Sequence, residues 1–305
     1  ISVFFWYISK NAAGKDDVSR ETLRFLFHAT NDIKSRGEGK GGKNMTESFR
    51  EGLGRRAAAL GVELTEAQLE KFFLYYERMT EKNKVMNLTS ITEESDVVLK
   101  HFTDSLSLAA VSLPSTGNVS RETLLRNTLP GKRLIDVGTG AGFPGLALKI
   151  AFPELEVVLN DSLQKRLRFL NELIEELNLK GISCVHGRAE ELAHERKWRG
   201  AFDFSVSRAV ARLSVLSEYD LPFVKNGGYF LAMKAGGIEE ELEEAKAAIR
   251  LLGGKLIKRE SFILPESDIE RSILLIGKLR ESPSRYPRRA GIPSKEPLGR
   301  AGKRE

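Results

Sequence analysis

The residues best suited to chemistry form a glycine-rich stretch at residues 136–145, with the sequence DVGTGAGFPG. It combines four glycines with the carboxylate of Asp136 and the ring of Phe143. Glycine lets a loop turn tightly and lets a ligand approach the backbone, because a Cβ would block both. A loop of this kind after a buried strand is typical of proteins that bind a nucleoside cofactor.

Two glycine patterns overlap in this stretch. From Gly140 it matches the G-x-G-x-x-G of dinucleotide-binding folds, and from Asp136 it matches the acidic-x-G-x-G-x-G loop of S-adenosylmethionine methyltransferases. The apolar run RLIDV ends at Val137, so the first loop glycine is Gly138. A dinucleotide pattern that starts there needs a third glycine at position 143, which is Phe143. The register therefore favours methyl transfer over hydride transfer.

Two acidic residues lie near the loop in the predicted fold, and each has two possible roles. Asp136 lies inside a strand that should be buried, and a buried carboxylate needs hydrogen bonds or a cation. It could reach the methionine ammonium of the cofactor through water or loop amides, or it could simply bond the amides of its own loop. Asp161 lies about twenty residues further on, where an acid binds ribose hydroxyls. It could also cap the helix that begins near Leu163.

The elements that must position these residues alternate between apolar strands and amphipathic helices. This alternation predicts a parallel sheet covered on both faces. We expect strands at 133–137, 156–160, 182–187, 202–207 and 228–234, and helices at 144–151, 163–178, 212–220 and 238–252. Two more strand-like runs, 255–264 and 271–278, have no helix between them and predict a closing antiparallel hairpin. A second mononucleotide-binding half would need another βαβ unit, so the hairpin also argues against a dinucleotide fold.

The segment before the sheet predicts a helical cap. Thr65 and Gln68 have capping-box spacing, and apolar residues follow at helical intervals. We expect Leu69, Phe72, Phe73, Tyr76 and Met79 to form a buried face, and a further helical run over 95–111. The predicted organisation is an upstream, disordered extension at 1–44, a helical region and linker at 45–130, a core at 131–278 and a basic C-terminal tail at 279–305.

Composition and charge narrow the class of protein. The chain is 41% hydrophobic, and no apolar run approaches the ~20 residues that span a bilayer. The single cysteine, Cys184, fits a reducing cytosol, so we expect a cytoplasmic protein with no membrane and no metal partner. The net charge is +6, and residues 278–305 carry nine Lys/Arg against three Asp/Glu, which accounts for all of it.

A basic tail on a neutral body suggests a polyanionic partner, most simply nucleic acid, although a solvated terminus would look the same. The candidate RNA contacts in the tail and at the head of the second core helix are Lys165, Arg166, Arg285, Arg288 and Arg289.

Several motifs occur in order and together resemble one family. They are NKVMNLTSI, HFTDSL, LIDVGTGAGFPGLALKI, DSLQKRLRFLNEL, GRAEEL, FDFSVSRAVA, LAMKAG and the ending SPSRYPRRAGIPSKEPL. Over about residues 46–298 the chain resembles the bacterial 16S ribosomal RNA guanine-N7 methyltransferases, the family long called glucose-inhibited division protein B. The resemblance implies a class I S-adenosylmethionine methyltransferase fold, that is, a Rossmann-like α/β sheet with a closing antiparallel hairpin and an N-terminal helical cap.

The resemblance also implies roles for individual residues. It places cofactor contacts at Gly138, Phe143, Ala189, Glu190 and Arg208, beside Asp136, Gly140 and Asp161 of the loop and second strand. No general base is implied, because guanine N7 carries an exposed lone pair, and catalysis then rests on alignment and desolvation. Arg208 and Lys234 are the candidate aligning residues. His101 and Asp104 in HFTDSL could cap the pocket or hold the N-terminal helices to the core.

The implied function is transfer of a methyl group from S-adenosyl-L-methionine to N7 of the 530-loop guanosine of 16S rRNA, position 527 in standard rRNA numbering. The acceptor would be the rRNA or the 30S particle, and the enzyme a monomer. Two alternatives remain open: a methyltransferase for another RNA or a small molecule, and a nucleotide- or RNA-binding protein without turnover. Removal of the tail after Lys278 is expected to weaken RNA binding and to leave cofactor affinity intact.

Overall fold

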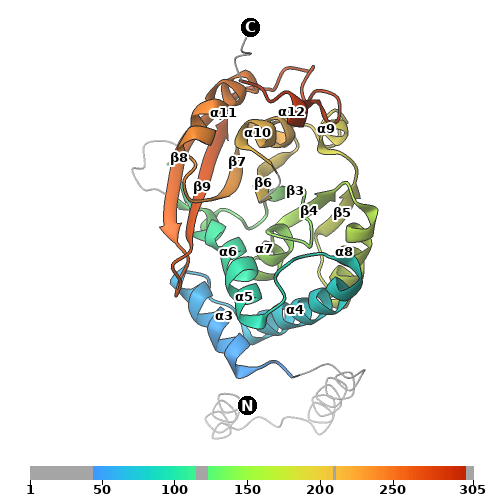
Figure 1. The fold of residues 1–305 in the computed structure, drawn as a ribbon, viewed down its shortest axis with the longest axis vertical. Coiled ribbons are helices and arrows are strands. Elements are labelled where there is room, and N and C mark those ends of the chain that lie inside the picture. Colours follow the sequence, from blue (N-terminus) through green and yellow to red (C-terminus); the bar gives the residue numbers. More distant parts are fainter. Residues whose placement is uncertain (1–43, 115–122, 209–210, 300–305) are drawn as a thin grey trace, which may run out of the picture. The chain divides into compact units, whose positions relative to one another are not determined.

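The computed structural model describes residues 44–114, 123–208 and 211–299, and a seven-stranded sheet lies at their centre (Figure 1). The strand order is β5-β4-β3-β6-β7-β9-β8. Strands β3 to β7 pair in parallel, β9 is antiparallel to β7, and β8 is antiparallel to β9. The strands are β3 (Arg133–Val137), β4 (Glu156–Asp161), β5 (Ile182–His186), β6 (Phe202–Arg208), β7 (Val224–Ala235), β8 (Gly254–Ile263) and β9 (Glu270–Lys278).

This topology confirms the predicted α/β fold with its closing hairpin. All seven strands occur where apolar runs predicted them, within a few residues. The chain winds from β3 outward to β5 and then returns to β6 on the other side of β3. Such a reversal leaves a crevice at the carboxyl ends of the strands, which is where ligands bind in open α/β sheets.

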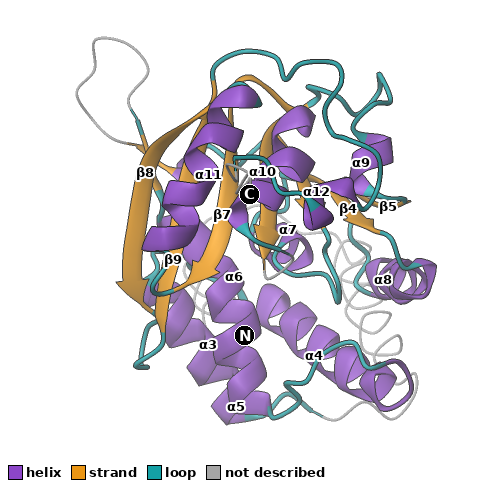
Figure 2. Cartoon of the chain, turned by 45° about the horizontal axis from the view of Figure 1, so that its top comes forward, coloured by secondary structure: helices purple, strands orange, loops and turns teal. Residues whose placement is uncertain are grey.

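Helices cover both faces of the sheet (Figures 1 and 2). One face packs against α7 (Gly145–Ala151), α8 (Gln164–Glu176) and the N-terminal helices, in one apolar cluster. The other packs against α10 (Leu213–Asp220) and α11 (Glu239–Leu251) in a second cluster. The shorter elements on this second side are α9 (Ala189–Leu192), η4 (Leu221–Phe223) and α12 (Ile292–Lys295).

The N-terminal helical region begins with α3 (Glu47–Ala59) and α4 (Glu66–Met86). The predicted capping box of α4 is present: the Thr65 hydroxyl accepts from the Gln68 amide and the Gln68 side chain accepts from the Thr65 amide. The predicted apolar face is buried with one exception. Tyr76 is only half buried, and its neighbour Tyr75 is fully buried instead.

The helical run predicted over 95–111 is irregular. It consists of α5 (Glu94–Val97), the π-helix η1 (Val98–Thr103), α6 (Asp104–Leu106) and the 3₁₀ turn η2 (Ser107–Ala110). The hydroxyls of Thr103 and Ser105 donate to the carbonyls of Val98 and His101, and such side-chain bonds compete with regular helix geometry. Short π-helical segments often occur at functional sites.

The predicted linker contributes a small element that the sequence did not reveal. Strand β1 (Ser112–Leu113) pairs antiparallel with β2 (Thr123–Leu124), followed by the 3₁₀ turn η3 (Leu125–Asn127). The part of the linker at 115–122 and nearly all of the predicted upstream extension lie outside the described residues. The division of the chain into the four predicted segments stays a prediction.

Residues 279–299 were expected to be a basic tail, but they pack onto the core and we call them the C-terminal strap. Ser282, Tyr286, Pro287 and Pro293 of the strap are buried. Arg199 holds the strap by donating to the carbonyls of Ser282, Pro283 and Tyr286. The sequence did not indicate this packing, because Arg199 lies more than eighty residues away from the strap carbonyls that it binds. Among all described residues, no helix is both long and apolar enough to cross a membrane.

Candidate active site

The glycine loop follows β3 at the carboxyl edge of the sheet and leads into α7. Gly138 has a φ of +74°, a conformation that side chains with a Cβ rarely adopt. Gly145 has a different reason to be glycine: a Cβ there would lie 2.6 Å from Leu159 Cδ2 and 2.9 Å from Asp136 Cβ. The loop can therefore present its backbone to a ligand while α7 packs closely against β3 and β4.

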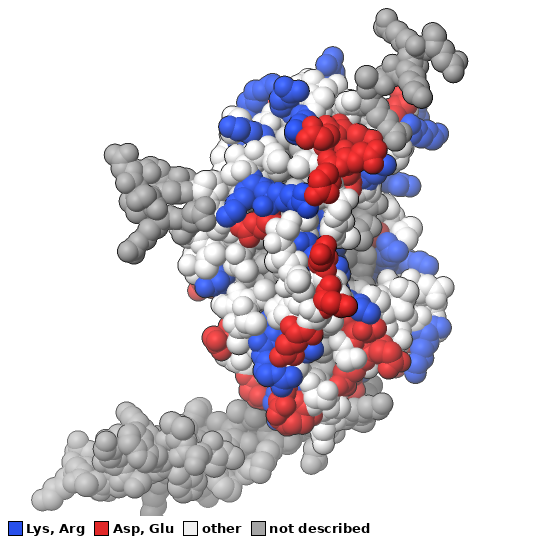
Figure 3. Space-filling model, turned by 60° about the vertical axis from the view of Figure 1, so that its left-hand side comes forward, with Lys and Arg blue, Asp and Glu red and all other residues white. Residues whose placement is uncertain are grey.

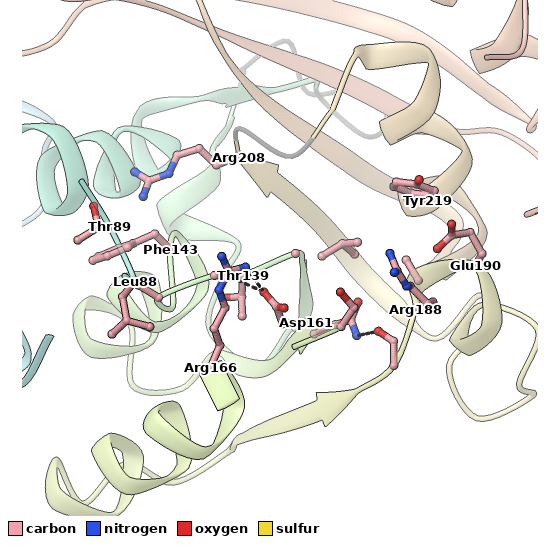
Figure 4. A pocket seen from close by; sticks show the side chains of 18 of the residues that line it. Leu88, Thr89, Thr139, Phe143, Asp161, Arg166, Arg188, Glu190, Arg208 and Tyr219 are labelled. Carbon is pink, nitrogen blue, oxygen red and sulfur yellow. Dashed lines mark hydrogen bonds and ion pairs between the residues drawn. The ribbon is translucent and has the colours of Figure 1, made fainter. Parts of the chain in front are cut away.

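A cavity of about 440 Å³ opens over this loop (Figure 4). Seven of the eight residues predicted to contact a cofactor line it, and they come from four separate strand ends and their loops. These seven are Gly138, Gly140, Phe143, Asp161, Ala189, Glu190 and Arg208. The fold thus brings together seven predicted residues that are distant in the sequence. Their contact with a cofactor stays a prediction.

Asp161 at the end of β4 faces this cavity and organises its floor. Its Oδ2 accepts from the Gly140 amide at 3.0 Å and from Arg166 Nη1 at 3.3 Å, and its Oδ1 accepts from the Leu163 amide at 2.8 Å. The predicted role as N-cap of α8 is wrong, because the N-cap is Leu163 without a side-chain cap bond, and Asp161 instead closes the turn just before the helix. Carboxylate oxygens have about four acceptor sites in total, so one site remains for a ligand hydroxyl.

Asp136, the eighth residue, does not line the cavity. It is fully buried beneath the loop, where its Oδ2 accepts from the Thr139 hydroxyl at 2.7 Å and from the Gly145 amide at 2.8 Å. Burial raises the pKa of Asp136 to about 6, although both hydrogen bonds oppose that shift. Of the two roles considered for Asp136, the geometry supports the bond to its own loop.

Phe143 stands at the other end of the cavity in a stack of rings. Its centroid lies 5.0 Å from that of Tyr75 and 4.6 Å from that of His101, nearly parallel to both. The Arg208 guanidinium lies 5.0 Å from the same centroid, which is within the range of a cation–π contact. The stack joins the N-terminal helices to the glycine loop.

His101 is held in one neutral form. Burial, together with the charge of Arg208, lowers the pKa of His101 to about 3. Arg208 Nη2 donates to His101 Nδ1 at 3.4 Å, so the ring proton lies on Nε2 and is donated to the Thr89 hydroxyl at 2.8 Å. His101 therefore lines the cavity and also packs the helical region against the loop, so its geometry fits both roles considered for it.

A second cavity of about 450 Å³ adjoins the first, and His101 and Arg208 line both. Its other polar residues are mostly cationic: Lys100, Asp104, Lys234 and Arg271. Asp104 is almost fully buried and bridges two guanidiniums, because its Oδ2 accepts from Arg208 at 3.1 Å and its Oδ1 accepts from Arg271 at 2.9 Å. A cavity lined by both apolar residues and ion-paired cations thus lies next to the loop cavity.

Lys234, the second predicted aligning residue, lines this second cavity. Its ammonium group is already engaged, since it donates to Glu241 at 2.6 Å and to the Ala211 carbonyl at 2.7 Å. Arg208 is the only one of the two that faces both cavities.

Some site residues escaped the sequence analysis. Arg188, Tyr219 and Thr89 line the first cavity, and Arg271 lines the second. Thr89 lies in the motif NLTS and Arg188 in GRAEEL, so their motifs were noted without a role for these positions. No sequence motif marked Tyr219 as a site residue. It lies late in α10 and reaches the cavity through the packing of α10 beside α9.

The five candidate RNA contacts occupy different environments. Lys165, Arg285 and Arg289 are exposed, and their contact with RNA stays a prediction. Arg166 lines the first cavity and pairs with Asp161. Arg288 was expected to meet phosphates, but its guanidinium is bound to the fully buried carboxylate of Glu218. The contact of Arg288 with RNA stays a prediction.

The fold and site together define the class of protein. A doubly wound sheet closed by an antiparallel hairpin carries an acidic-x-G-x-G-x-G loop after its first strand and an acid after its second. This arrangement is that of a class I S-adenosylmethionine-dependent methyltransferase. The site fits the cofactor, because glycine leaves the backbone of the loop open and Asp161 keeps an acceptor for a ribose hydroxyl.

Comparison with known proteins identifies the family. The model for the family GidB, described as rRNA small subunit methyltransferase G, matches residues 68–269. A protein of Lachnoclostridium phytofermentans named Ribosomal RNA small subunit methyltransferase G is 50% identical over 240 residues, which cover 79% of this chain and 93% of the relative. A relative of the same name from Acetivibrio thermocellus is 50% identical over 242 residues, with 79% and 93% coverage. The chain belongs to the rRNA small subunit methyltransferase G family.

Proposed function

We propose that this enzyme transfers a methyl group from S-adenosyl-L-methionine to N7 of a guanine in 16S rRNA, the 530-loop guanosine at position 527. The observation that carries the proposal is the pair of adjoining cavities. One is built on the methyltransferase loop, the other is lined by cationic groups, and Arg208 and His101 belong to both. The name of the relatives, rRNA small subunit methyltransferase G, supports rRNA as the acceptor.

The chemistry of this reaction places few demands on the side chains. The cofactor supplies an electrophilic sulfonium methyl group, and guanine N7 supplies an exposed lone pair, so no proton must be removed before attack. The residues of the second cavity need only hold the base in line and exclude water. Asp104 is not a candidate base, because both its oxygens accept hydrogen bonds from guanidiniums. Its role is to hold Arg208 and Arg271 at the junction of the cavities.

A polyanionic acceptor fits the cations at the second cavity better than a small neutral molecule does. The face shown in Figure 3 mixes acidic and basic groups and forms no continuous basic surface on that side. We propose that RNA contacts the protein at the mouth of the second cavity, which Lys100 and Arg271 line. We further propose that the enzyme acts as a monomer in the cytoplasm, on rRNA or on the 30S particle.

The proposal is tested by methyl transfer from labelled S-adenosylmethionine. Purified protein is incubated in parallel with 16S rRNA and with 30S particles from cells that lack this modification, with 23S rRNA as the control acceptor. We expect label in one or both small-subunit acceptors, released as 7-methylguanine, and none in 23S rRNA. Label in another base or only in another RNA would favour the alternative methyltransferase. Cofactor binding without transfer to any acceptor would favour a binding protein without turnover.

A further inference from the structure

The C-terminal strap touches the end of the loop cavity that lies opposite Phe143. Glu190 and Tyr219 line this end and lie close together in Figure 4. The Gly291 amide of the strap donates to Glu190 Oε1 at 3.1 Å, and the Tyr219 hydroxyl is hydrogen bonded to the Ser294 hydroxyl at 2.9 Å. Each of these two lining residues is therefore held by the strap.

We propose that the strap is part of the cofactor site: it positions Glu190 and Tyr219, so that cofactor affinity depends on residues 279–299. This inference rests on the proposed function, since it concerns the same loop cavity. It assigns Arg288, Gly291 and Ser294 as positioning residues that act through Glu218, Glu190 and Tyr219.

The first anchor of the strap is the ion pair between Arg288 and Glu218. The Arg288 amide and Nε donate to Glu218 Oε1 at 2.7 and 2.9 Å, and Nη2 donates to Oε2 at 2.7 Å. Glu218 is fully buried in α10, one residue before Tyr219. Removal of the guanidinium would leave a buried carboxylate without its cation, which strongly disfavours the packed position of the strap.

The second anchor lies after α9, the helix that carries Glu190. His194 Nε2 is hydrogen bonded to the Pro287 carbonyl at 2.7 Å, and Arg199 binds three strap carbonyls. The strap therefore contacts both elements that supply the residues at this end of the cavity, α9 and α10. The positions of the strap, α9 and α10 therefore depend on one another.

This proposal predicts a different outcome for removal of the tail from the one expected from the sequence, which was unchanged cofactor affinity. A truncation after Lys278 would remove the hydrogen-bond partners of Glu190 and Tyr219 and leave Glu218 buried and unpaired. We expect cofactor affinity to fall in the absence of any RNA. An Arg288 that served only as an RNA contact would give the opposite pattern, with weaker RNA binding and unchanged cofactor affinity.

The test is calorimetric titration of the RNA-free full chain with S-adenosylhomocysteine. Arg288→Ala should raise the Kd by about tenfold or more, because a buried charge loses its partner. Ser294→Ala removes the hydroxyl that is hydrogen bonded to Tyr219. It should raise the Kd by about two- to fivefold. Lys295→Ala is the matched control, because it removes a charge from an exposed position of the same strap and should leave the Kd within about twofold.

Arg288→Ala can also unfold the chain, so circular dichroism is recorded for each variant. If that variant does not fold, Ser294→Ala decides, since it leaves no buried charge and alters the strap alone. Unchanged affinity in the folded variants, beside a wild type that binds, overturns the strap proposal alone. A wild-type protein that does not bind S-adenosylhomocysteine would instead overturn the proposed function.

Discussion

At the scale of single residues, Asp220 shows how buried chemistry supports the loop. It is fully buried between Ser205 and Ser207, and both hydroxyls are hydrogen bonded to it. The Ser207 hydroxyl lies 2.8 Å from Asp220 Oδ2 and 3.1 Å from the Val137 carbonyl, two acceptors for one proton. A protonated Asp220 resolves the conflict, because it donates to Ser207 and Ser207 then donates to Val137, the residue before Gly138. Burial, with a smaller contribution from the charge of Asp136, raises the pKa of Asp220 to about 8, although the bonds that both serine hydroxyls can donate to the ionised carboxylate lower it.

Asp220→Asn should therefore stabilise the protein at neutral and alkaline pH. The ordinary pKa of aspartate is 3.8, so between about pH 4 and pH 8 the unfolded chain ionises this group while the folded chain does not. The unfolded state then binds fewer protons, and the free energy of unfolding of the wild type falls as pH rises. Asparagine does not ionise in this pH range, and its amide can make the same hydrogen bonds as a protonated carboxyl group.

The measurement is urea unfolding of wild type and Asp220→Asn at pH 5 and at pH 8. The variant should gain about 3 kcal/mol relative to wild type between the two pH values, given about 1.4 kcal/mol per unit of pH over which only the unfolded chain is ionised. Asp268→Asn, an exposed carboxylate, is the control and should show no such trend. A pH-independent difference for Asp220→Asn would contradict a protonated Asp220.

Gly138→Val should abolish cofactor binding. Valine is branched at Cβ, its side chain would stand in the loop cavity, and the φ of +74° is strongly unfavourable for it. Gly131→Val is the control for backbone strain, because Gly131 has a φ of +69° and a Cβ there meets open space. Calorimetry with S-adenosylhomocysteine should show loss of binding for Gly138→Val only, and retained affinity in a folded Gly138→Val would refute the assigned frame of the loop.

At the level of secondary-structure elements, helix α4 contacts the glycine loop through Tyr75. Tyr75 is fully buried, donates to the Ala141 carbonyl at 2.7 Å and stacks on Phe143. Gln68 at the start of the same helix donates to the last carbonyls of α7, at Ile150 and Ala151. The helical region is thus fastened to both ends of the loop–α7 unit.

Tyr75→Phe should lower stability and loosen the loop. The ring stack survives, but the Ala141 carbonyl loses its buried donor, which costs about 1–3 kcal/mol. We expect a lower free energy of unfolding and a Kd for S-adenosylhomocysteine raised by about two- to tenfold. Tyr76→Phe deletes the same hydroxyl from a half-buried neighbour and should leave the Kd unchanged. Equal effects of the two substitutions on the Kd would show that Tyr75 does not hold the loop.

The sequence predicted elements whose causes are local. The strands of the sheet follow from short apolar runs, the start of α4 from Thr65 and Gln68, and the closing hairpin from two runs without a helix between them. It did not predict Tyr219 at the cavity, the packed strap or the β1–β2 pair. Each of these depends on partners far away in the chain, such as Arg199 for Pro283 or Glu218 for Arg288. Composition alone marked the strap as a basic tail, because charge counts do not reveal that Arg288 has a buried partner.

At the scale of the whole described molecule, segments from both ends of the chain complete the site on the sheet. The N-terminal helices supply Tyr75, His101 and Asp104 around the loop and the second cavity. The C-terminal strap holds Glu190 and Tyr219 at the opposite end. The parallel strands supply the loop, Asp161 and Arg208 between them. Under the proposed function, this arrangement would separate cofactor binding in the cavity over the glycine loop from acceptor binding in the second cavity, which Arg208 and Arg271 line.

The proposed reaction is methyl transfer to N7 of one guanine in small-subunit rRNA. The most direct measurement is chemical mapping of the acceptor after the reaction, because reduction and aniline treatment cleave RNA at 7-methylguanine. Unmodified 16S rRNA or 30S particles are incubated with the protein and the cofactor, and the cleavage sites are located by primer extension. We predict one new cleavage site, at position 527, that requires both protein and cofactor. Methyl incorporation without cleavage at position 527, or cleavage at a different guanine, would show that the proposed acceptor atom is wrong.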